Sequence, residues 1–138
     1  KLRNLLTSAV PSLAAEAVEM LHTKESQRGH ARSISHIAAH PGGRDVINAV
    51  AARLPGFDFD AGRRVLRDHG NMSSPSVLFV LNDLLQERMP GEDDDWWLVS
   101  FGAGFSAHGC RLGRWGMTPA DGGWGGKAEV TLKVGGAA

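Results

Sequence analysis

The chain has 138 residues, enough for one domain with a hydrophobic core, and 42% of its residues are apolar, as in ordinary globular proteins. Lysine plus arginine and aspartate plus glutamate number 15 each, and this balance argues against a nucleic-acid or membrane-surface partner. No apolar run is long enough to span a membrane, no secretory signal pattern is recognisable, and the single cysteine, Cys110, excludes an internal disulfide framework, so we expect a cytoplasmic protein.

Apolar residues at helical spacing predict a first helix over residues 8–23, with Pro11 and Ser12 in its first turn. Residues 24–32 are polar and contain a glycine, so we expect a loop there. Residues 33–39 form a short apolar segment, which predicts a buried strand.

The predicted strand ends at His40-Pro41-Gly42-Gly43. The proline favours an extended backbone at His40, and the paired glycines permit a tight turn. Two helices are predicted next, over residues 44–54 and 61–68. Pro55-Gly56 closes the first, and the second ends at Gly70.

A turn and the start of another helix follow at Gly70-Asn71-Met72-Ser73-Ser74-Pro75. Ser74 is predicted to cap the helix by accepting from its free N–H groups, and Pro75 suits the first helical position. The run that follows is apolar on nearly every face, so the helix, over residues 75–88, is expected to be buried. Asn71 is then held directly before a fixed helix, although asparagine is also common in ordinary turns.

Two strands, over residues 96–101 and 105–112, are expected to form a hairpin around a glycine turn. Residues 128–134 alternate in polarity and suggest an additional edge strand. Helices that alternate with buried strands indicate an α/β fold, a layered sheet with helices on its faces. Three good strands make a narrow sheet for helices this apolar, so the fold is expected to be incomplete alone.

His40 and Asn71 are the candidate functional residues. In open α/β sheets ligands gather outside the carboxyl ends of strands, and a histidine there can act as base, acid or donor near neutral pH. The other histidines are interpreted as surface or packing residues: His22, His30, His36, His69 and His108. With one cysteine and no histidine pair at a zinc spacing, we expect neither a metal site nor a cofactor.

Three short motifs stand out along the chain. They are Ser35-His36-Ile37-Ala38-Ala39-His40-Pro41-Gly42-Gly43, Gly70-Asn71-Met72-Ser73-Ser74 and Phe101-Gly102-Ala103-Gly104-Phe105. In this order and spacing they resemble the type III polyketide synthases, the chalcone and stilbene synthase family. The resemblance covers residues from about 10 to 114 and only the C-terminal part of that family's chain. It implies the C-terminal half of a thiolase-like fold, with α-β-α layers and a mixed sheet.

The resemblance also implies a chemistry. In that family a cysteine carries an acyl starter as a thioester, malonyl-CoA loses CO2, and the resulting enolate attacks the acyl group. His40 matches the family histidine and Asn71 the asparagine, so together they would stabilise the enolate as an oxyanion hole, and the histidine would favour the thiolate. The family's cysteine lies in the N-terminal half, and Cys110 follows both partners, so we interpret Cys110 as a packed strand residue.

Further residues match positions that contact the substrate in the family. They lie within or just after the three motifs: Gly42, Gly43, Asp45, Ser73, Phe101, Gly102 and Ala103. The last motif departs from the family's Gly-Phe-Gly-Pro-Gly, because Ser100 stands in place of the first glycine and Ala103 in place of the proline. These changes are expected to reshape the floor of the pocket that governs product length and ring closure.

For the chain as a whole, the resemblance implies a C-terminal thiolase-like half over residues 1–114 and a glycine-rich extension over residues 115–138. The expected substrates are malonyl-CoA and an acyl-CoA, in secondary metabolite biosynthesis, and the complete enzyme is expected to be a homodimer. The chain begins at Lys1 without a methionine, which indicates an expression product, a processed protein or a fragment. The segment alone is expected to be inactive, because the nucleophilic cysteine would lie in a separate N-terminal half.

Two alternatives remain open. The chain could be a non-catalytic, thiolase-like fragment that acts as an assembly or dimerisation partner, and exposed apolar helix faces would favour that function. A Cys-His-Asn hydrolase of the papain kind is disfavoured, because there the cysteine precedes the other two residues, whereas Cys110 follows both His40 and Asn71.

Overall fold

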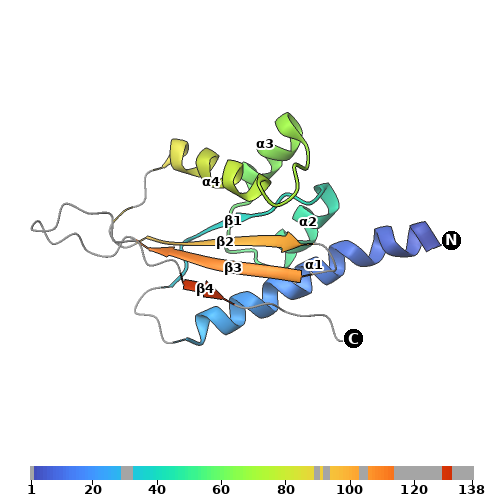
Figure 1. The fold of residues 1–138 in the computed structure, drawn as a ribbon. Coiled ribbons are helices and arrows are strands. Elements are labelled where there is room, and N and C mark those ends of the chain that lie inside the picture. The colour runs from blue at the N-terminus through green and yellow to red at the C-terminus, as the bar shows by residue number, and fades with distance from the viewer. Residues whose placement is uncertain are drawn as a thin grey trace, which may run out of the picture.

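The computed structural model describes residues 2–28, 33–88, 91, 94–102, 106–113 and 129–131. A long helix and a short strand are followed by a run of helices and then by a terminal run of strands (Figure 1). Their order is α1 (Leu2–Ser26), β1 (His36–Ala39), α2 (Arg44–Arg53), α3 (Asp60–His69), α4 (Ser76–Glu87), β2 (Asp95–Gly102), β3 (Ser106–Gly113) and β4 (Glu129–Thr131).

The strands of the described region form a mixed sheet in the order β1-β2-β3-β4. β1 lies parallel to β2, with His36 opposite Trp96 and Ala39 opposite Val99, whereas β2, β3 and β4 pair antiparallel. A parallel pair requires a crossover connection, which α2, α3 and α4 supply. The predicted α/β fold with a mixed sheet is therefore confirmed, as are the hairpin and the edge strand.

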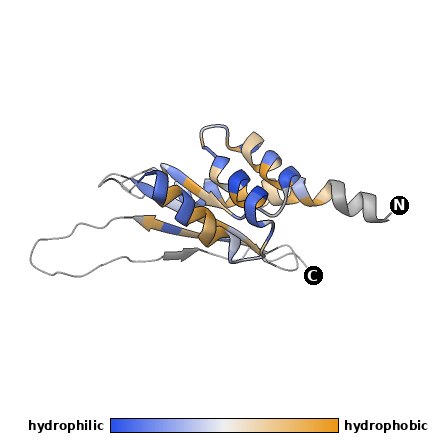
Figure 2. Cartoon of the chain, turned by 90° about the horizontal axis from the view of Figure 1, so that it is seen from above, coloured by the Kyte–Doolittle hydropathy of each residue, from blue (hydrophilic) through white to orange (hydrophobic). Residues whose placement is uncertain are grey.

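Helices cover both faces of the sheet, and side chains of β1 alternate between two hydrophobic cores. Ile37 and Ala39 face a core shared with α1 and α2, whereas Ala38 faces a smaller core shared with α3 and α4. Figure 2 shows hydrophobic residues along the strands, and both hydrophobic and hydrophilic residues on the helices. Val18 and Val80 are 0% and 1% exposed. Burying each valine stabilises the fold by about 1.5–3 kcal/mol.

α1 is longer than the predicted helix over residues 8–23, because Pro11 lies inside the helix rather than in its first turn. A proline inside a helix removes one backbone hydrogen bond and costs about 3 kcal/mol. The 25-residue helix buries Val18 and Leu21 in the main core, and this apolar contact offsets the lost bond.

The prediction that Ser74 caps α4 is wrong. Pro75 occupies the N-cap position without a side-chain hydrogen bond, and the Met72 N–H donates to Ser76 Oγ at 2.8 Å. Ser73 adopts a left-handed backbone with φ of 64°, and its carbonyl accepts from the Ser76 N–H at 3.0 Å. The chain therefore turns before the helix, and the hydroxyl that meets a free backbone N–H belongs to Ser76.

The prediction that α4 is buried is also wrong. Ser76, Val77 and Val80 are buried, but Leu78 is 58% exposed and Phe79 is 44% exposed. One helix on the outer layer of a sheet can bury only one face, and on the opposite face of α4 the His69 ring, with its centroid 5.5 Å from that of Phe79, covers Phe79 only in part. The result is an exposed hydrophobic surface on this side of the molecule.

The remaining helices agree closely with prediction. α2 and α3 match the predicted helices over residues 44–54 and 61–68 to within one residue at each end. Gly70 ends α3 with φ of 73°, and its N–H donates to the Leu66 carbonyl at 3.0 Å. A positive φ favours glycine, so the predicted helix end has a clear backbone cause.

Several predictions concern residues outside the described part of the chain. The hairpin turn includes Ala103 and Gly104, which are outside it, and so is most of the predicted extension over residues 115–138. The division of the chain near residue 114 therefore stays a prediction.

Candidate active site

His40 follows β1 directly and is held at the carboxyl edge of the sheet. Its backbone N–H donates to the Val99 carbonyl on β2 at 2.8 Å, which extends the strand pairing by one residue. Its carbonyl accepts from the Gly42 N–H at 2.9 Å, so the chain turns away at once. Pro41 has no N–H to donate and ends the ladder. Backbone bonds therefore fix where His40 lies, whatever its side chain contacts.

The His40 side chain is buried against Phe101. Only 5% of the residue is exposed, and the two ring centroids are 5.9 Å apart in an edge-on arrangement. Nδ1 has no hydrogen-bond partner within the described part of the chain. Burial lowers the pKa of the His40 imidazole, because removal from water disfavours the cation. The ring is therefore neutral near pH 7 in this chain and can donate through one nitrogen and accept through the other.

Acid should destabilise this fold through His40. An unfolded histidine takes up a proton near pH ~6.5, whereas burial lowers the pKa of His40 in the folded chain. Below about pH 6.5 the unfolded state binds more protons, so the free energy of unfolding falls by up to about 1.4 kcal/mol per pH unit until the folded-state pKa is passed. In urea titrations between about pH 7.5 and 5.5, we expect His40→Gln to lose less stability than the parent.

The control for this titration is His69→Gln, which removes an exposed imidazole at the end of α3 and is compared directly with His40→Gln. Burial also lowers the pKa of His22, so part of the acid loss should persist in every variant. Equal acid losses in the parent and in His40→Gln would contradict the prediction.

Asn71 lies beyond α3 and is tied to the turn that follows His40. Its Nδ2 donates to the Gly42 carbonyl at 2.9 Å, and its Oδ1 accepts from the Ser73 N–H at 2.9 Å. The two bonds fix which way the amide points, since one requires a donor and the other an acceptor. An amide nitrogen carries two hydrogens, so one N–H of Asn71 remains for a ligand.

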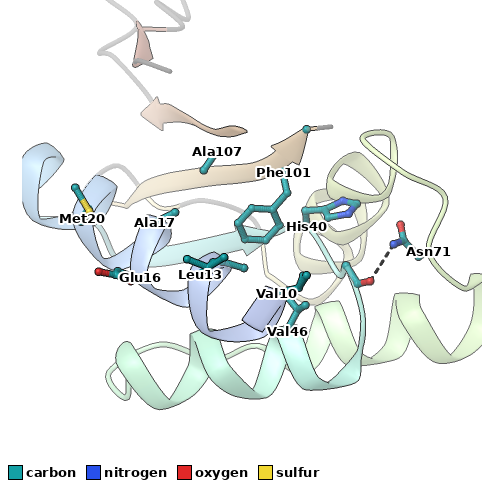
Figure 3. Close-up of a pocket in the computed structure, with 13 residues that line it drawn as sticks. Val10, Leu13, Glu16, Ala17, Met20, His40, Val46, Asn71, Phe101 and Ala107 are labelled. Carbon is teal, nitrogen blue, oxygen red and sulfur yellow. Dashed lines mark hydrogen bonds between the residues drawn. The ribbon is translucent and has the colours of Figure 1, made fainter. Parts of the chain in front are cut away.

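His40 and Asn71 meet at one wide pocket of about 490 Å³. Figure 3 shows both residues at one end of this pocket, near Val10 and Val46, and Met20 at the other end. The dashed line in Figure 3 marks the bond from Asn71 to Gly42. The lining residues are Val10, Leu13, Ala14, Glu16, Ala17, Met20, His40, Gly42, Val46, Asn71, Phe101, Gly102 and Ala107.

The structure brings some of the predicted site residues together and leaves others apart. Those that line the pocket are His40, Asn71, Gly42, Phe101 and Gly102. Those that do not line it are Gly43, Asp45 and Ser73, although Ser73 contacts Asn71 through its backbone. Asp45 is exposed in the first turn of α2, and Ala103 lies outside the described residues.

Sequence reasoning missed the wall that α1 contributes to the pocket. Val10, Leu13 and Ala17 belong to the apolar stripe that predicted the helix, yet nothing in the stripe indicates which face turns toward His40. Leu13 and Met20 are 47% and 44% exposed, so this wall is open. Only the long-range packing of α1 against β3 and α2 determines this arrangement.

The pocket is apolar and carries little charge. Among the lining residues that the structure describes, the titratable groups are Glu16 and His40, and there is no lysine or arginine. Such a lining suits an aliphatic or aromatic group beside a small polar centre. A phosphate group would find no cationic partner there.

Cys110 is placed as a strand residue. It lies on β3 opposite Leu98, is half-buried, and is absent from the pocket lining. Burial, and then the charge of Glu25, raise the pKa of the Cys110 thiol, which disfavours the reactive thiolate.

Within the described ranges, no cluster of three or more histidine, cysteine, aspartate or glutamate side chains could hold a metal ion, and no helix could cross a membrane.

Comparison with known proteins gives the pocket a context. The family model for the C-terminal domain of chalcone and stilbene synthases matches residues 2–113. The chain is 37% identical over 76 residues to a protein of Bacillus subtilis (strain 168) named as a chalcone synthase, a match covering 54% of this chain and 21% of that protein. Over 80 residues it is 36% identical to type III polyketide synthase B of Arabidopsis thaliana, covering 52% of this chain and 20% of that protein.

The chain is also similar to proteins named 3-ketoacyl-CoA synthases. The chain is 31% identical over 97 residues to 3-ketoacyl-CoA synthase 5 of Arabidopsis thaliana, covering 67% of this chain and 20% of that protein. The match therefore spans about a fifth of the length of each of these relatives.

Proposed function

Since this chain belongs to the chalcone and stilbene synthase family, as its C-terminal domain, we propose that it supplies two of the three catalytic groups of a polyketide-forming acyltransferase. The third group, a nucleophilic cysteine, would come from an N-terminal half. The two halves would build a thiolase-like fold, and a mixed sheet with helices on both faces supports that proposal.

The observation that carries the proposal is that His40 and Asn71 line the same apolar pocket. The bond from Asn71 Nδ2 to the Gly42 carbonyl ties Asn71 to the turn that follows His40. Each residue can direct an N–H toward a developing negative oxygen. Donors that are already in place at low dielectric stabilise such a charge without reorganisation. The two residues would then form the oxyanion hole of a decarboxylase.

The proposed reaction has two steps. In the first, the bond between C2 of the malonyl group and its carboxylate breaks and CO2 leaves. The electron pair moves into a thioester enolate, whose oxygen accepts hydrogen bonds from His40 and Asn71. In the second, the enolate carbon attacks the acyl-cysteine carbonyl, so a carbon–carbon bond forms, the carbon–sulfur bond breaks, and the cysteine thiolate leaves.

The pocket lining suggests where the acyl group lies. Gly42, Phe101 and Gly102 are proposed to contact it, together with the apolar wall of α1. Gly43, Asp45, Ser73 and Ala103 are proposed to act nearer the substrate entrance or the loop end of the site. The CoA phosphates of malonyl-CoA would be held by residues outside this pocket. The working enzyme is proposed to be a homodimer.

The proposal is tested with the full-length gene product and radiolabelled malonyl-CoA. We expect release of labelled CO2, release of CoA, and an acyl chain extended by two carbons for each malonyl-CoA consumed. Mass spectrometry of the product would count the extensions, and a single extension would indicate a ketoacyl-CoA synthase rather than a polyketide synthase. No turnover of malonyl-CoA with any acyl-CoA starter would overturn the proposal.

A second candidate function is that of a non-catalytic assembly partner. The exposed apolar residues of two helices favour it: Leu13, Met20, Leu78 and Phe79. Light scattering of the chain with and without a second polypeptide, together with the decarboxylase assay of the full-length product, separates the two candidates. A soluble chain that forms a defined complex with another polypeptide, combined with a full-length product lacking decarboxylase activity, would support the assembly function.

A further inference from the structure

The segment that carries Asn71 is fixed at both ends before α4 begins. At its start, Gly70 ends α3 in a left-handed conformation, and the Gly70 N–H donates to the Leu66 carbonyl. Asn71 itself bonds Gly42 and Ser73. The contacts that hold the end of the segment next to α4 therefore determine how precisely the Asn71 amide is oriented.

Ser76 holds this end of the segment. It is a polar residue with 0% of its surface exposed, at the first position of α4. Its Oγ accepts from the N–H of Met72, the residue directly after Asn71, at 2.8 Å. Its own N–H donates to the Ser73 carbonyl at 3.0 Å. The Ser76 hydroxyl thus fixes the peptide group that joins Asn71 to Met72, and the Ser76 backbone N–H closes the turn through Ser73.

The turn at Ser73 needs such support. A serine with φ of 64° is in a region that L-residues rarely adopt, and such conformations persist only where surrounding bonds impose them. The bonds imposing it here come from Asn71 Oδ1 and from Ser76. The Met72 side chain packs beside the small core that contains Val77 and Val80, which keeps Ser76 in register with the turn.

We propose that Ser76 is a positioning residue, whose buried hydroxyl aims the Asn71 amide at the reacting oxygen although it does not touch substrate. This inference rests on the proposed function, because it assigns Asn71 the part of an oxyanion donor. It differs from a merely structural account of Ser76 because it predicts a loss in the chemical step at unchanged substrate binding.

The decisive variant is Ser76→Ala in the full-length protein. We expect kcat for malonyl-CoA decarboxylation to fall by about 10- to 100-fold, because a small misplacement of a catalytic group costs about that much in rate. KM should change by less than about twofold, since the pocket lining is untouched. The pH profile should keep its shape, because His40 is unaltered. Amide exchange at Met72 should become faster, as its acceptor is gone.

Two further variants serve as matched controls for Ser76→Ala. Ser74→Ala removes an exposed hydroxyl from the same turn and should leave kcat and Met72 exchange unchanged. Ser76→Cys keeps the volume with a weaker acceptor and should lie between the parent and Ser76→Ala. If Ser76→Ala fails to fold, the kcat of Ser76→Cys decides the matter.

The outcomes separate this proposal from the proposed function. Faster Met72 exchange together with a parent-like kcat in Ser76→Ala, while Asn71→Ala is strongly impaired, would overturn the role of Ser76 alone. If Ser76→Ala fails to fold, the same result in Ser76→Cys would overturn it. Parent-like decarboxylation by Asn71→Ala would overturn both. Reduced kcat with unchanged KM and an unchanged pH profile supports the positioning role.

Discussion

Replacing His40 with alanine in the full-length protein should lower kcat for malonyl-CoA decarboxylation by about 10³- to 10⁴-fold. The variant loses an N–H that would stabilise the enolate oxygen and also the imidazole that would favour the thiolate of the nucleophilic cysteine. Both losses act on the reaction rather than on substrate binding, so KM should change little. Labelled CO2 release at saturating malonyl-CoA measures the effect.

We expect His40→Ala to fold, because backbone hydrogen bonds hold residue 40 in place. His40 is held by its N–H bond to Val99 and by the turn bond from Gly42, and neither involves the ring. His40→Gln separates the two functions, because an amide can donate to an enolate but cannot form a cation beside a thiolate. It should retain more decarboxylation than alanine and lose cysteine alkylation. His69→Ala is the matched control, and a His40→Ala variant as active as that control would refute the assignment.

Asn71→Ala should lower the same kcat by about 10²- to 10³-fold, the usual loss when one oxyanion-hole donor is removed. Asn71→Asp should be worse than alanine despite its similar shape. A carboxylate can still accept from the Ser73 N–H, but it opposes the Gly42 carbonyl and would repel the enolate, since it offers no donor. Comparing Asn71→Ala with Asn71→Asp therefore separates two effects: the loss of a hydrogen-bond donor to the enolate and the repulsion of the enolate by a negative charge.

The stability cost of these changes should be modest. Asn71 is an exposed residue, and a net side-chain hydrogen bond contributes only about 0.5–1.5 kcal/mol. Asn48→Ala, on the exposed side of α2, is the matched control for removing a surface amide. Decarboxylation by Asn71→Asp at the rate of this control would show that Asn71 does not donate to the enolate.

The sequence predicted the elements around the site where local rules decide them. Pro41 ends the ladder after β1, and Gly70 ends α3 with a positive φ, so the two turns that carry His40 and Asn71 were recognisable. That these turns meet was implied by a family resemblance and not by local pattern. The contact itself depends on the bond from Asn71 to Gly42, which joins residues 29 positions apart.

The wrong predictions have long-range or competing causes. Ser74 is a reasonable cap by residue type, but the chain turns through a left-handed Ser73, and the N-cap position falls to Pro75, which makes no side-chain hydrogen bond. The apolar face of α4 predicts burial only if something covers it, and sequence pattern cannot show what does. Pro11 usually marks a helix start, yet the apolar contacts of α1 keep it inside a longer helix.

The bond between Asn71 and Gly42 has a consequence for how this site tolerates sequence change. Its acceptor is a main-chain carbonyl, so no substitution at Gly42 can delete the accepting atom. A Cβ at Gly42 would also meet its nearest side-chain atoms, on His40 and Val46, at 3.5–3.7 Å, which is ordinary contact. Point mutation at Gly42 therefore leaves the acceptor of this hydrogen bond in place. During evolution the bond would be lost chiefly by substitution of Asn71.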